Sequence, residues 1–144
     1  MKLGAMQDWP LRVMRFVDHA EREHPQAEIV SAWADGSVTR TNWGEVAQQA
    51  RKMAQALERL GIRPGDRVAT LAMNHSRHLI AWYGVCGMGG VLHTINPRLF
   101  DDQLDYIANH AEDRVLLYDR VFAPIVERMK PRWRTIERYI CFEE

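Results

Sequence analysis

The amino-acid sequence predicts an α/β fold in which helices flank a mainly parallel sheet and a small β-hairpin precedes it. From residue 68 onward, short apolar runs alternate with segments of helical periodicity. Strands separated by helices of about 10–13 residues are typical of βαβ units, which place neighbouring strands parallel. Upstream, Asp35-Gly36 separates two short extended segments, and this pair is a hairpin turn signal because glycine accepts a positive φ.

Length and composition indicate one globular domain, with no further domain in residues 1–144. Apolar residues make up 47% of the chain and charged residues 26%, as in ordinary soluble proteins. The formal net charge of zero argues against a nucleic-acid partner, which needs a basic surface. No apolar stretch reaches the roughly 18 residues of a transmembrane helix. Cys86 and Cys141 have no disulfide-framework spacing, and this favours a cytoplasmic location.

The first third of the chain is predicted to form a helix and then the hairpin. The helix covers Leu11–His24 and ends at Pro25, which cannot continue the hydrogen-bond ladder. Its apolar stripe consists of Val13, Phe16, Val17 and Ala20. The hairpin strands are Ala27–Trp33 and Ser37–Arg40.

A second helix is predicted between Asn42 and Gly61. Asn42 with Glu45 fits a capping box, and Thr41 is the alternative cap. Gly61 stands where a left-handed C-cap is expected. The predicted buried stripe contains Val46, Ala50, Met53, Ala54, Leu57 and Leu60.

The remaining chain is predicted to supply the parallel sheet and its helices. The strands are Val68–Ala72, Gly90–Ile95, Arg114–Tyr118 and Ile136–Phe142. The helices are Ser76–Met88, Asp101–His110 and Val121–Lys130. Helix Ser76–Met88 is apolar nearly all round, a pattern typical of a helix buried on several sides. This helix therefore needs more protein to cover it than these residues supply.

Three segments together carry a resemblance to one enzyme family. Thr39–Asn74 contains a long helix, a Gly-x-x-x-Gly-Asp-Arg-Val turn and an apolar strand, and this order resembles the opening of adenylate-forming enzymes. His75–Leu99, with its run His-Thr-Ile-Asn-Pro-Arg, resembles bacterial medium- and long-chain fatty-acid–CoA ligases and the related methylthiopropionyl-CoA ligases. Asp102–Asp119 resembles the next helix–strand unit of the same enzymes. The chain thus resembles the AMP-forming acyl-CoA synthetases of the adenylate-forming superfamily.

The resemblance implies that residues 1–144 form the N-terminal part of the large domain of a cytoplasmic, dimeric ligase. Such a ligase uses ATP, Mg²⁺ and CoA to convert a fatty acid into its CoA thioester through an acyl-adenylate. Methylthiopropionate or another short acid is the alternative substrate. The family's phosphate loop, rich in Ser, Thr and Gly and ending in Pro-Lys-Gly, is absent here, and none of Lys2, Lys52 and Lys130 has a suitable context. We therefore expect no catalytic residue and no bound cofactor in this chain, and no ATP turnover by it alone.

Two residues stand where open α/β sheets place ligands, at the carboxyl ends of parallel strands. His75 follows the strand Val68–Ala72, and Arg98 follows the strand Gly90–Ile95. His75 with His78 has metal-ligand spacing, but we favour polar residues of a helix start that partly face solvent, capped by Asn74 or Ser76. For Arg98 we favour an ion pair with Asp101 or Asp102 after a turn at Asn96-Pro97.

Other candidates also have plain structural interpretations. Trp82 and Tyr83 are candidates for lining an acyl pocket, whereas aromatic residues on an apolar helix are more often core. Asp119 follows the strand Arg114–Tyr118, where receiver domains have a phosphate-accepting aspartate, but the acidic pair and lysine that such domains need are missing, so a helix N-cap is favoured. The glycines at 84, 87, 89 and 90 end a helix rather than open one, which indicates close packing.

The rival hypothesis is a stand-alone flavodoxin-like or receiver-like module, which would need complete phosphate or flavin loops at the strand ends. If the chain is instead a fragment, we expect the uncovered apolar surface to make it self-associate.

Overall fold

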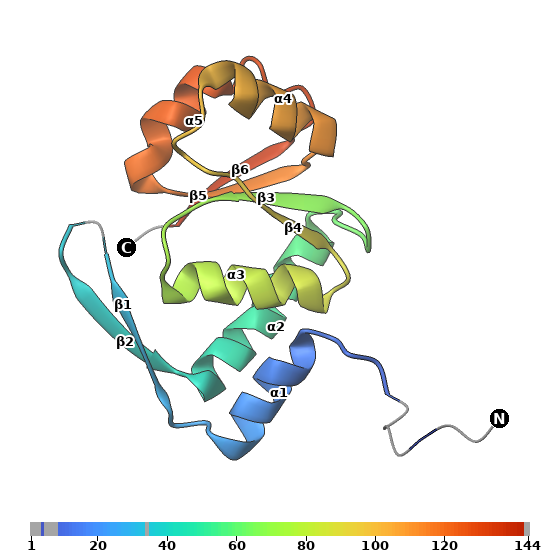
Figure 1. Ribbon diagram of the computed structural model, residues 1–144, viewed down its shortest axis with the longest axis vertical. Coiled ribbons are helices and arrows are strands. Elements are labelled where there is room, and N and C mark those ends of the chain that lie inside the picture. The colour runs from blue at the N-terminus through green and yellow to red at the C-terminus, as the bar shows by residue number, and fades with distance from the viewer. Residues whose placement is uncertain (1–3, 5–8, 34, 143–144) are drawn as a thin grey trace.

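The computed structural model describes residue 4, residues 9–33 and residues 35–142 (Figure 1). Its helices are α1 (Met14–Glu23), α2 (Trp43–Arg59), α3 (Ser76–Gly87), α4 (Asp101–Ala111) and α5 (Ala123–Met129), with a 3₁₀ turn η1 (Arg120–Phe122) before α5. Its strands are β1 (Glu28–Ala32), β2 (Val38–Asn42), β3 (Arg67–Leu71), β4 (Val91–Thr94), β5 (Val115–Asp119) and β6 (Arg138–Phe142).

Four parallel strands form a sheet in the order β4-β3-β5-β6, with helices on both faces. Helices α2 and α3 lie on one face and α4 and α5 on the other (Figure 1). Because side chains alternate along a strand, β3 sends Val68 into the core below α2 and α3, and Ala69 and Leu71 into the core below α4 and α5. This arrangement, with the antiparallel β1–β2 hairpin, confirms the predicted fold class.

The chain order creates a switch point between the two central strands. β3 continues through α3 to β4 at one side, whereas β5 continues through α5 to β6 at the other. The loops that leave the carboxyl ends of β3 and β5 therefore diverge. Open α/β sheets commonly bind ligands in the crevice that such divergence leaves.

The hairpin forms at the predicted turn and packs beside α3 rather than joining the sheet (Figure 1). Gly36 has φ of 86°, which a residue with a side chain rarely adopts, and the Asp35 carboxylate accepts the Ser37 N–H at 2.8 Å. The N-terminal helix begins at Met14 rather than Leu11. Its predicted stripe was wrong at Phe16, which is 71% exposed, because α1 buries Val17 against α2 and turns Phe16 away.

Helix α2 begins as predicted and ends slightly differently. The Asn42 side chain accepts the Glu45 N–H at 2.9 Å, so Asn42 is the cap. Leu60 was predicted to be buried but is 38% exposed, because the helix already ends at Arg59. Gly61, at φ of 89°, reverses the chain so that Ile62 takes the buried position.

The later elements all differ from their predicted bounds by a residue or more, and two of them differ most. The segment predicted as the helix Val121–Lys130 starts as the 3₁₀ turn η1, and the α-helix proper spans Ala123–Met129. The last strand begins at Arg138 rather than Ile136, although Ile136 is buried in the core between the sheet and helices α4 and α5. These shifts leave the order of elements unchanged.

The amino end of the sheet is held together by a guanidinium clamp. Arg114 donates to the Asp66 carboxylate at 2.7 Å, to the Gly61 carbonyl at 3.0 Å and to the Glu137 carboxylate at 3.0 Å. Asp66 also accepts the Arg63 N–H at 2.8 Å. The aspartate in the Gly-x-x-x-Gly-Asp-Arg-Val turn thus joins the turn to the start of β5, which is a structural role.

Helix α3 packs so closely on α2 that one glycine is required. A Cβ placed on Gly84 would lie 2.8 Å from the Met53 Cβ and 3.0 Å from the Ala50 carbonyl oxygen. The close-packing interpretation of this glycine is confirmed. The prediction that α3 is buried on several sides holds for Tyr83 and Val85, while Trp82 remains 40% exposed on the open side.

We predict that Gly84→Ala lowers the free energy of unfolding by about 1–3 kcal/mol, because the methyl group overlaps backbone-proximal atoms that cannot move aside. Gly87→Ala is the matched control on the same helix. Its Cβ would meet only the flexible end of Met14, 3.0 Å from the sulfur, and alanine favours the helix. Urea denaturation of both variants measures the difference. Equal stability of the two variants would contradict the packing argument.

Candidate functional site at the carboxyl edge of the sheet

The crevice at the switch point is bridged by a hydrogen-bonded pair, His75 and Asp119. His75 Nε2 lies 2.8 Å from Asp119 Oδ1, and the other carboxylate oxygen accepts the Met73 N–H at 2.7 Å. His75 Nδ1 accepts the His78 N–H at 3.2 Å, so His75 caps α3. Because Nδ1 is an acceptor here, the ring proton is on Nε2 and is donated to Asp119. The pair joins the ends of β3 and β5.

The hairpin closes over this pair through an aromatic stack. The Trp33 ring lies 4.4 Å from the His75 ring at an interplanar angle of 25°, and Arg77 lies 5.0 Å from the Trp33 ring. Phe142, at the end of β6, meets His75 edge-on at 5.6 Å. The remaining cavity, lined by Trp33, Met73, His75, Asp119, Arg120, Val121 and Phe142, holds about 20 Å³. A water fits that volume and a nucleotide does not.

Two expectations about these residues were therefore wrong. His75 was expected to face solvent partly, but its side chain is 1% exposed and both ring nitrogens are engaged. Asp119 was expected to cap the following helix, but its carboxylate makes no cap bond there, because it turns back to the β3 loop. The cap expected from Asn74 or Ser76 is supplied by His75 itself. The pair therefore ties the β3 loop to the end of β5 and caps α3.

Both ring nitrogens of His78, in the first turn of α3, also have hydrogen-bond partners. Its Nδ1 lies 3.1 Å from the Met73 carbonyl and its Nε2 lies 3.0 Å from the Thr70 hydroxyl. The carbonyl can only accept, so Nδ1 carries the proton and the Thr70 hydroxyl donates to Nε2. Burial lowers the pKa of His78, which favours this neutral form.

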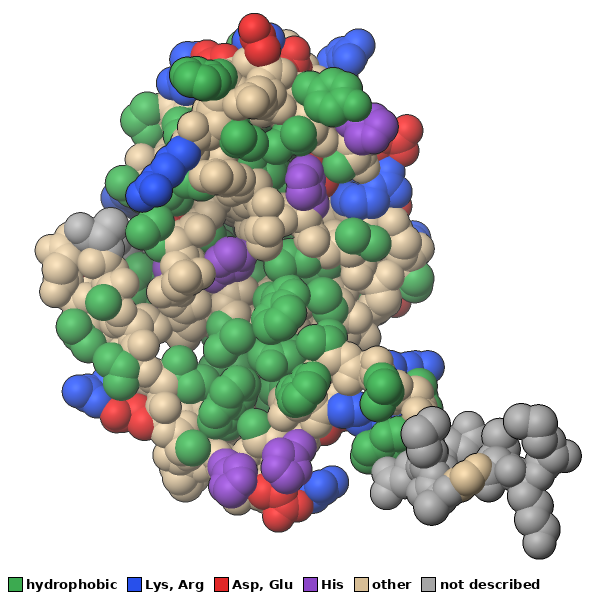
Figure 2. All heavy atoms as spheres, in the orientation of Figure 1, with side chains coloured by type: hydrophobic (Ala, Val, Ile, Leu, Met, Phe, Trp, Pro, Cys, Tyr) green, Lys and Arg blue, Asp and Glu red, His purple; other side chains and the backbone are tan. Residues whose placement is uncertain are grey.

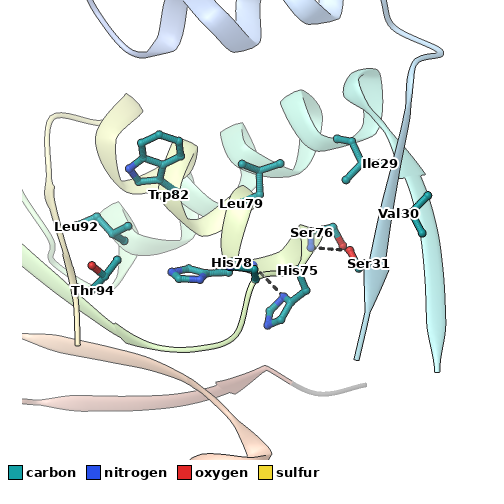
Figure 3. A pocket seen from close by; sticks show the side chains of 11 residues that line it. Ile29, Val30, Ser31, His75, Ser76, His78, Leu79, Trp82, Leu92 and Thr94 are labelled. Atoms are coloured by element: carbon teal, nitrogen blue, oxygen red, sulfur yellow. Dashed lines mark hydrogen bonds between the residues drawn. The ribbon is translucent and has the colours of Figure 1, made fainter. Parts of the chain in front are cut away.

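Beside the tie lies an open groove between the hairpin, α3 and β4 (Figure 3). It has a volume of about 360 Å³. Figure 3 shows Trp82 and Leu79 of α3 along one wall, Ile29 of β1 opposite, and Leu92 of β4 at the far end. None of the described residues that line it is Asp, Glu, Lys or Arg. The groove is therefore uncharged, with apolar walls and with hydroxyl and amide side chains of Ser31, Asn74, Ser76 and Thr94 also in its lining.

The four residues that the sequence suggested for the site edge or acyl pocket lie in different places. His75 and Trp82 both line the groove. Tyr83 points to the other side of α3, where it is buried against Val17 and Val46, and burial raises its pKa. Arg98 lies outside the groove on the exposed turn after β4, where its N–H donates to the Asn96 side chain at 3.0 Å.

The turn at Asn96-Pro97 is confirmed, but the ion pair expected for Arg98 is wrong. Asp101 pairs with Arg128 at 2.9 Å, and Asp102 pairs with Arg132 at 2.8 Å. Both acidic side chains at the start of α4 therefore pair with arginines in or just after helix α5. The Arg98 side chain makes no ion pair within residues 9–33 and 35–142.

A second histidine–aspartate pair was not anticipated. His93 Nδ1, on β4, lies 2.7 Å from Asp113 Oδ2, just before β5. The Asp113 side chain is wholly buried, and its other oxygen has no hydrogen-bond partner among the described residues. Hydrogen bonding and charge attraction from Asp113 raise the pKa of His93, against the opposing effect of burial. Spacing gave no signal for this pair, because 20 residues separate its members.

The sequence also gave no reason to expect Trp33 or Ser31 at the site. The Ser31 hydroxyl accepts the Ser76 N–H at 2.8 Å, so the hairpin helps to satisfy the start of α3. Trp33 donates to the Thr39 hydroxyl at 2.8 Å, which orients its ring across the hairpin. The position of Trp33 at the end of the predicted strand Ala27–Trp33 was the only sequence feature that distinguished it.

Within the described ranges, no group of three or more His, Cys, Asp or Glu side chains could hold a metal ion. No helix in that part of the chain is both long and apolar enough to cross a membrane. Cys86 and Cys141 are free thiols.

Comparison with known proteins identifies the class to which this fold and sequence belong. Residues 17–141 match the AMP-binding enzyme family. The chain belongs to the AMP-binding enzyme family.

The relatives are acyl-CoA ligases. The chain is 51% identical over 138 residues to 3-methylmercaptopropionyl-CoA ligase of Ruegeria lacuscaerulensis, covering 96% of this chain and 26% of that protein. It is 50% identical over 124 residues to medium-chain-fatty-acid–CoA ligase of Ectopseudomonas oleovorans, covering 86% and 23%. The crystal structure of the anthranilate CoA ligase AuaEII with anthranoyl-AMP matches with a TM-score of 0.77 and 25% identity, covering 95% of this chain and 27% of that one. The chain thus spans about a quarter of the length of these relatives.

We predict that Asp119→Ala lowers the free energy of unfolding by about 2–4 kcal/mol, because the His75 and Met73 donors lose their acceptors. Asp102→Ala is the control, and its effect should stay within about 0.5 kcal/mol because that carboxylate is exposed. Chemical denaturation measures both. A mild effect of Asp119→Ala, similar to the control, would show that the tie contributes little.

We predict that the stability advantage of the wild type over His93→Gln is largest at low pH. Because the folded-state pKa of His93 is raised above the unfolded value of about 6.5, its contribution is fully present below that value. It is lost as the pH rises through the folded-state pKa. Denaturation of both proteins across this range measures the trend. In an Asp113→Asn background the trend should disappear, and its persistence there would refute the assignment.

Proposed function

We propose that this chain is the N-terminal part of the large domain of an AMP-forming fatty-acid–CoA ligase. The family match over residues 17–141 carries the proposal, and the ligase names of the relatives support it. In the reaction, a fatty-acid carboxylate oxygen attacks the α-phosphorus of ATP and pyrophosphate leaves. The CoA thiolate then attacks the acyl carbonyl carbon and AMP leaves, so that the products are acyl-CoA, AMP and pyrophosphate.

In this proposal the 144 residues form a scaffold and take no part in the chemistry. The reaction needs positioned cations around the phosphates. Lys52 lies on the surface of α2, and Lys130 follows α5, with its ammonium group 5.2 Å from the Tyr139 ring. No acidic cluster in the described part of the chain suits Mg²⁺. We propose that ATP, Mg²⁺ and CoA are held by residues outside this chain.

For the four candidate residues the structure supports different proposals. Trp82 is half-exposed in an apolar groove, so it is the one whose surroundings suit an apolar contact. His75 and Tyr83 are engaged in structural contacts. For Arg98 we propose a surface role at the edge of the site, because it is exposed at the carboxyl end of β4.

A second substrate is supported by one observation. The Ruegeria relative, a 3-methylmercaptopropionyl-CoA ligase, is as similar to this chain as the medium-chain relative is. A short sulfur-containing acid is therefore the alternative to a medium- or long-chain fatty acid.

We also propose that the complete ligase is a cytoplasmic homodimer. The two free thiols are consistent with a reducing compartment. The homodimer is what the resemblance to dimeric acyl-CoA ligases implies. The apolar surface exposed over α3 in Figure 2 is the surface that the sequence predicts the rest of the polypeptide to cover, so it is not assigned to the dimer contact.

We predict that the product of the complete open reading frame forms acyl-CoA, AMP and pyrophosphate from a fatty acid, ATP, Mg²⁺ and CoA. The isolated 144-residue chain should release no pyrophosphate, because it lacks the phosphate loop. A coupled pyrophosphate assay with acids of graded length, including 3-methylmercaptopropionate, measures both. Pyrophosphate release by the 144-residue chain would contradict the scaffold assignment, and an inactive complete product would contradict the function.

A further inference from the structure

The second histidine–aspartate pair joins two strands that are not neighbours in the sheet. In the order β4-β3-β5, β3 lies between β4, which carries His93, and the start of β5, which Asp113 precedes. His93 is in register with Ala69 of β3, whose side chain lies in the core below α4 and α5, so His93 points to the same face. The His93 ring therefore reaches across β3 to Asp113.

Strand β4 needs this side-chain contact because it lies at the edge of the sheet. Within the described residues it pairs with β3 alone, and none of its four residues, Val91–Thr94, is fully buried. Segments with few buried contacts open most readily. The strand leads into the Asn96-Pro97-Arg98 turn, so an interaction that holds β4 also positions that turn.

The two members of the pair differ in their access to water. The Asp113 side chain is wholly buried, and in the described part of the chain the His93 ring, 2.7 Å away, is the one hydrogen-bond partner of its carboxylate. The His93 side chain is 26% exposed. A proton can therefore reach His93 from solvent, whereas water cannot replace His93 as the partner of the carboxylate.

Other ionisable side chains stand on the elements around the pair, and each has a partner of its own. Arg67 of β3 binds the Glu112 carboxylate at 2.6 Å. Arg114, just before β5, forms the guanidinium clamp, and His110 of α4 stacks on the Tyr106 ring. None of them makes a hydrogen bond or an ion pair with either member of the pair within residues 9–33 and 35–142.

Protonation of His93 therefore changes the strength of the contact. With an imidazolium, the buried carboxylate faces an opposite charge, and such a charge-assisted hydrogen bond is about twice as strong as a neutral one. With a neutral ring, the Asp113 charge stays buried without a compensating charge, which is unfavourable. Hydrogen bonding and charge attraction from Asp113 accordingly raise the pKa of His93.

We infer that the His93–Asp113 pair is a pH-sensitive switch, which holds the edge strand β4 and the turn that follows it when His93 is protonated and releases them when His93 is neutral. The stabilisation is complete below the unfolded-state pKa of about 6.5 and is lost as the pH rises through the higher folded-state pKa. The inference goes beyond the proposed function and does not depend on it, because it concerns the order of a strand and a turn rather than the reaction.

Amide hydrogen exchange with mass spectrometry tests the inference on the complete gene product without substrates. Wild type and His93→Gln are compared at about pH 5.5 and at about pH 8.5, on either side of the pKa of an unperturbed histidine. Comparison at equal pH cancels the pH dependence of intrinsic exchange. Residues 91–98 should be several-fold better protected in the wild type at the lower pH and nearly equal in the two proteins at the higher pH.

Two variants serve as controls for this comparison. His110→Gln removes an exposed histidine from α4 and should leave the protection of residues 91–98 unchanged at both pH values. In an Asp113→Asn background, the effect of His93→Gln should no longer depend on pH. A protection ratio that is the same at both pH values in the original background would overturn the inference.

A low, non-denaturing concentration of urea distinguishes local opening from unfolding of the whole molecule. Local opening exposes little surface, so urea should accelerate exchange in residues 91–98 less than in α2. Equal acceleration would mean that β4 opens only when the whole molecule unfolds, and the switch would be refuted.

Exchange of the histidine ring Cε1–H provides a measurement on the wild type that needs no variant to fold. Its pH profile gives the titration midpoint of each histidine in the complete product. The midpoint of His93 should lie above that of exposed His110. A midpoint equal to or below that of His110 would contradict the inference even if every variant failed to fold.

Discussion

The carboxylate of Asp119 is the group on which the arrangement of this molecule most depends. It stands at the point where the loops of β3 and β5 diverge, and both of its oxygens accept hydrogen bonds from the β3 loop. Through His75 the same interaction caps α3, and through the His75–Trp33 stack it holds the hairpin. Buried donors and acceptors need hydrogen-bond partners, and the Asp119 carboxylate supplies two of them to the β3 loop.

This tie explains why a favoured place for ligands is closed here. The switch point of an open α/β sheet ordinarily leaves a crevice, but Trp33, His75 and Phe142 fill it with packed rings. A hydrogen-bonded histidine and aspartate also occur in catalytic sites, but here their other polar atoms bind the backbone N–H groups of Met73 and His78. Each ring nitrogen of His75 and each carboxylate oxygen of Asp119 has a hydrogen-bond partner within the fold, so the pair holds the β3 loop, the end of β5 and the start of α3 together.

The segments that carry the family resemblance have structural roles of the same kind. Asp66 of the Gly-x-x-x-Gly-Asp-Arg-Val turn binds Arg114 across the amino end of the sheet. Gly84 of α3 leaves room for the Met53 side chain of α2, where the two helices pack closely. Asp66 and Gly84 therefore both serve the packing of one α/β layer.

The sequence by itself determined the order of elements, the hairpin turn, the caps at Asn42 and Gly61, and the family, because each depends on residues close together in the chain. Only the tertiary structure decided the partners of Asp119 and of His93, the exposure of Phe16 and Leu60, and the closure of the crevice. Hydrophobic periodicity predicts which face of a helix a residue lies on, but it does not predict which neighbouring element covers that face. A hydrogen bond between residues 44 positions apart follows from the strand order, and no local pattern encodes that order.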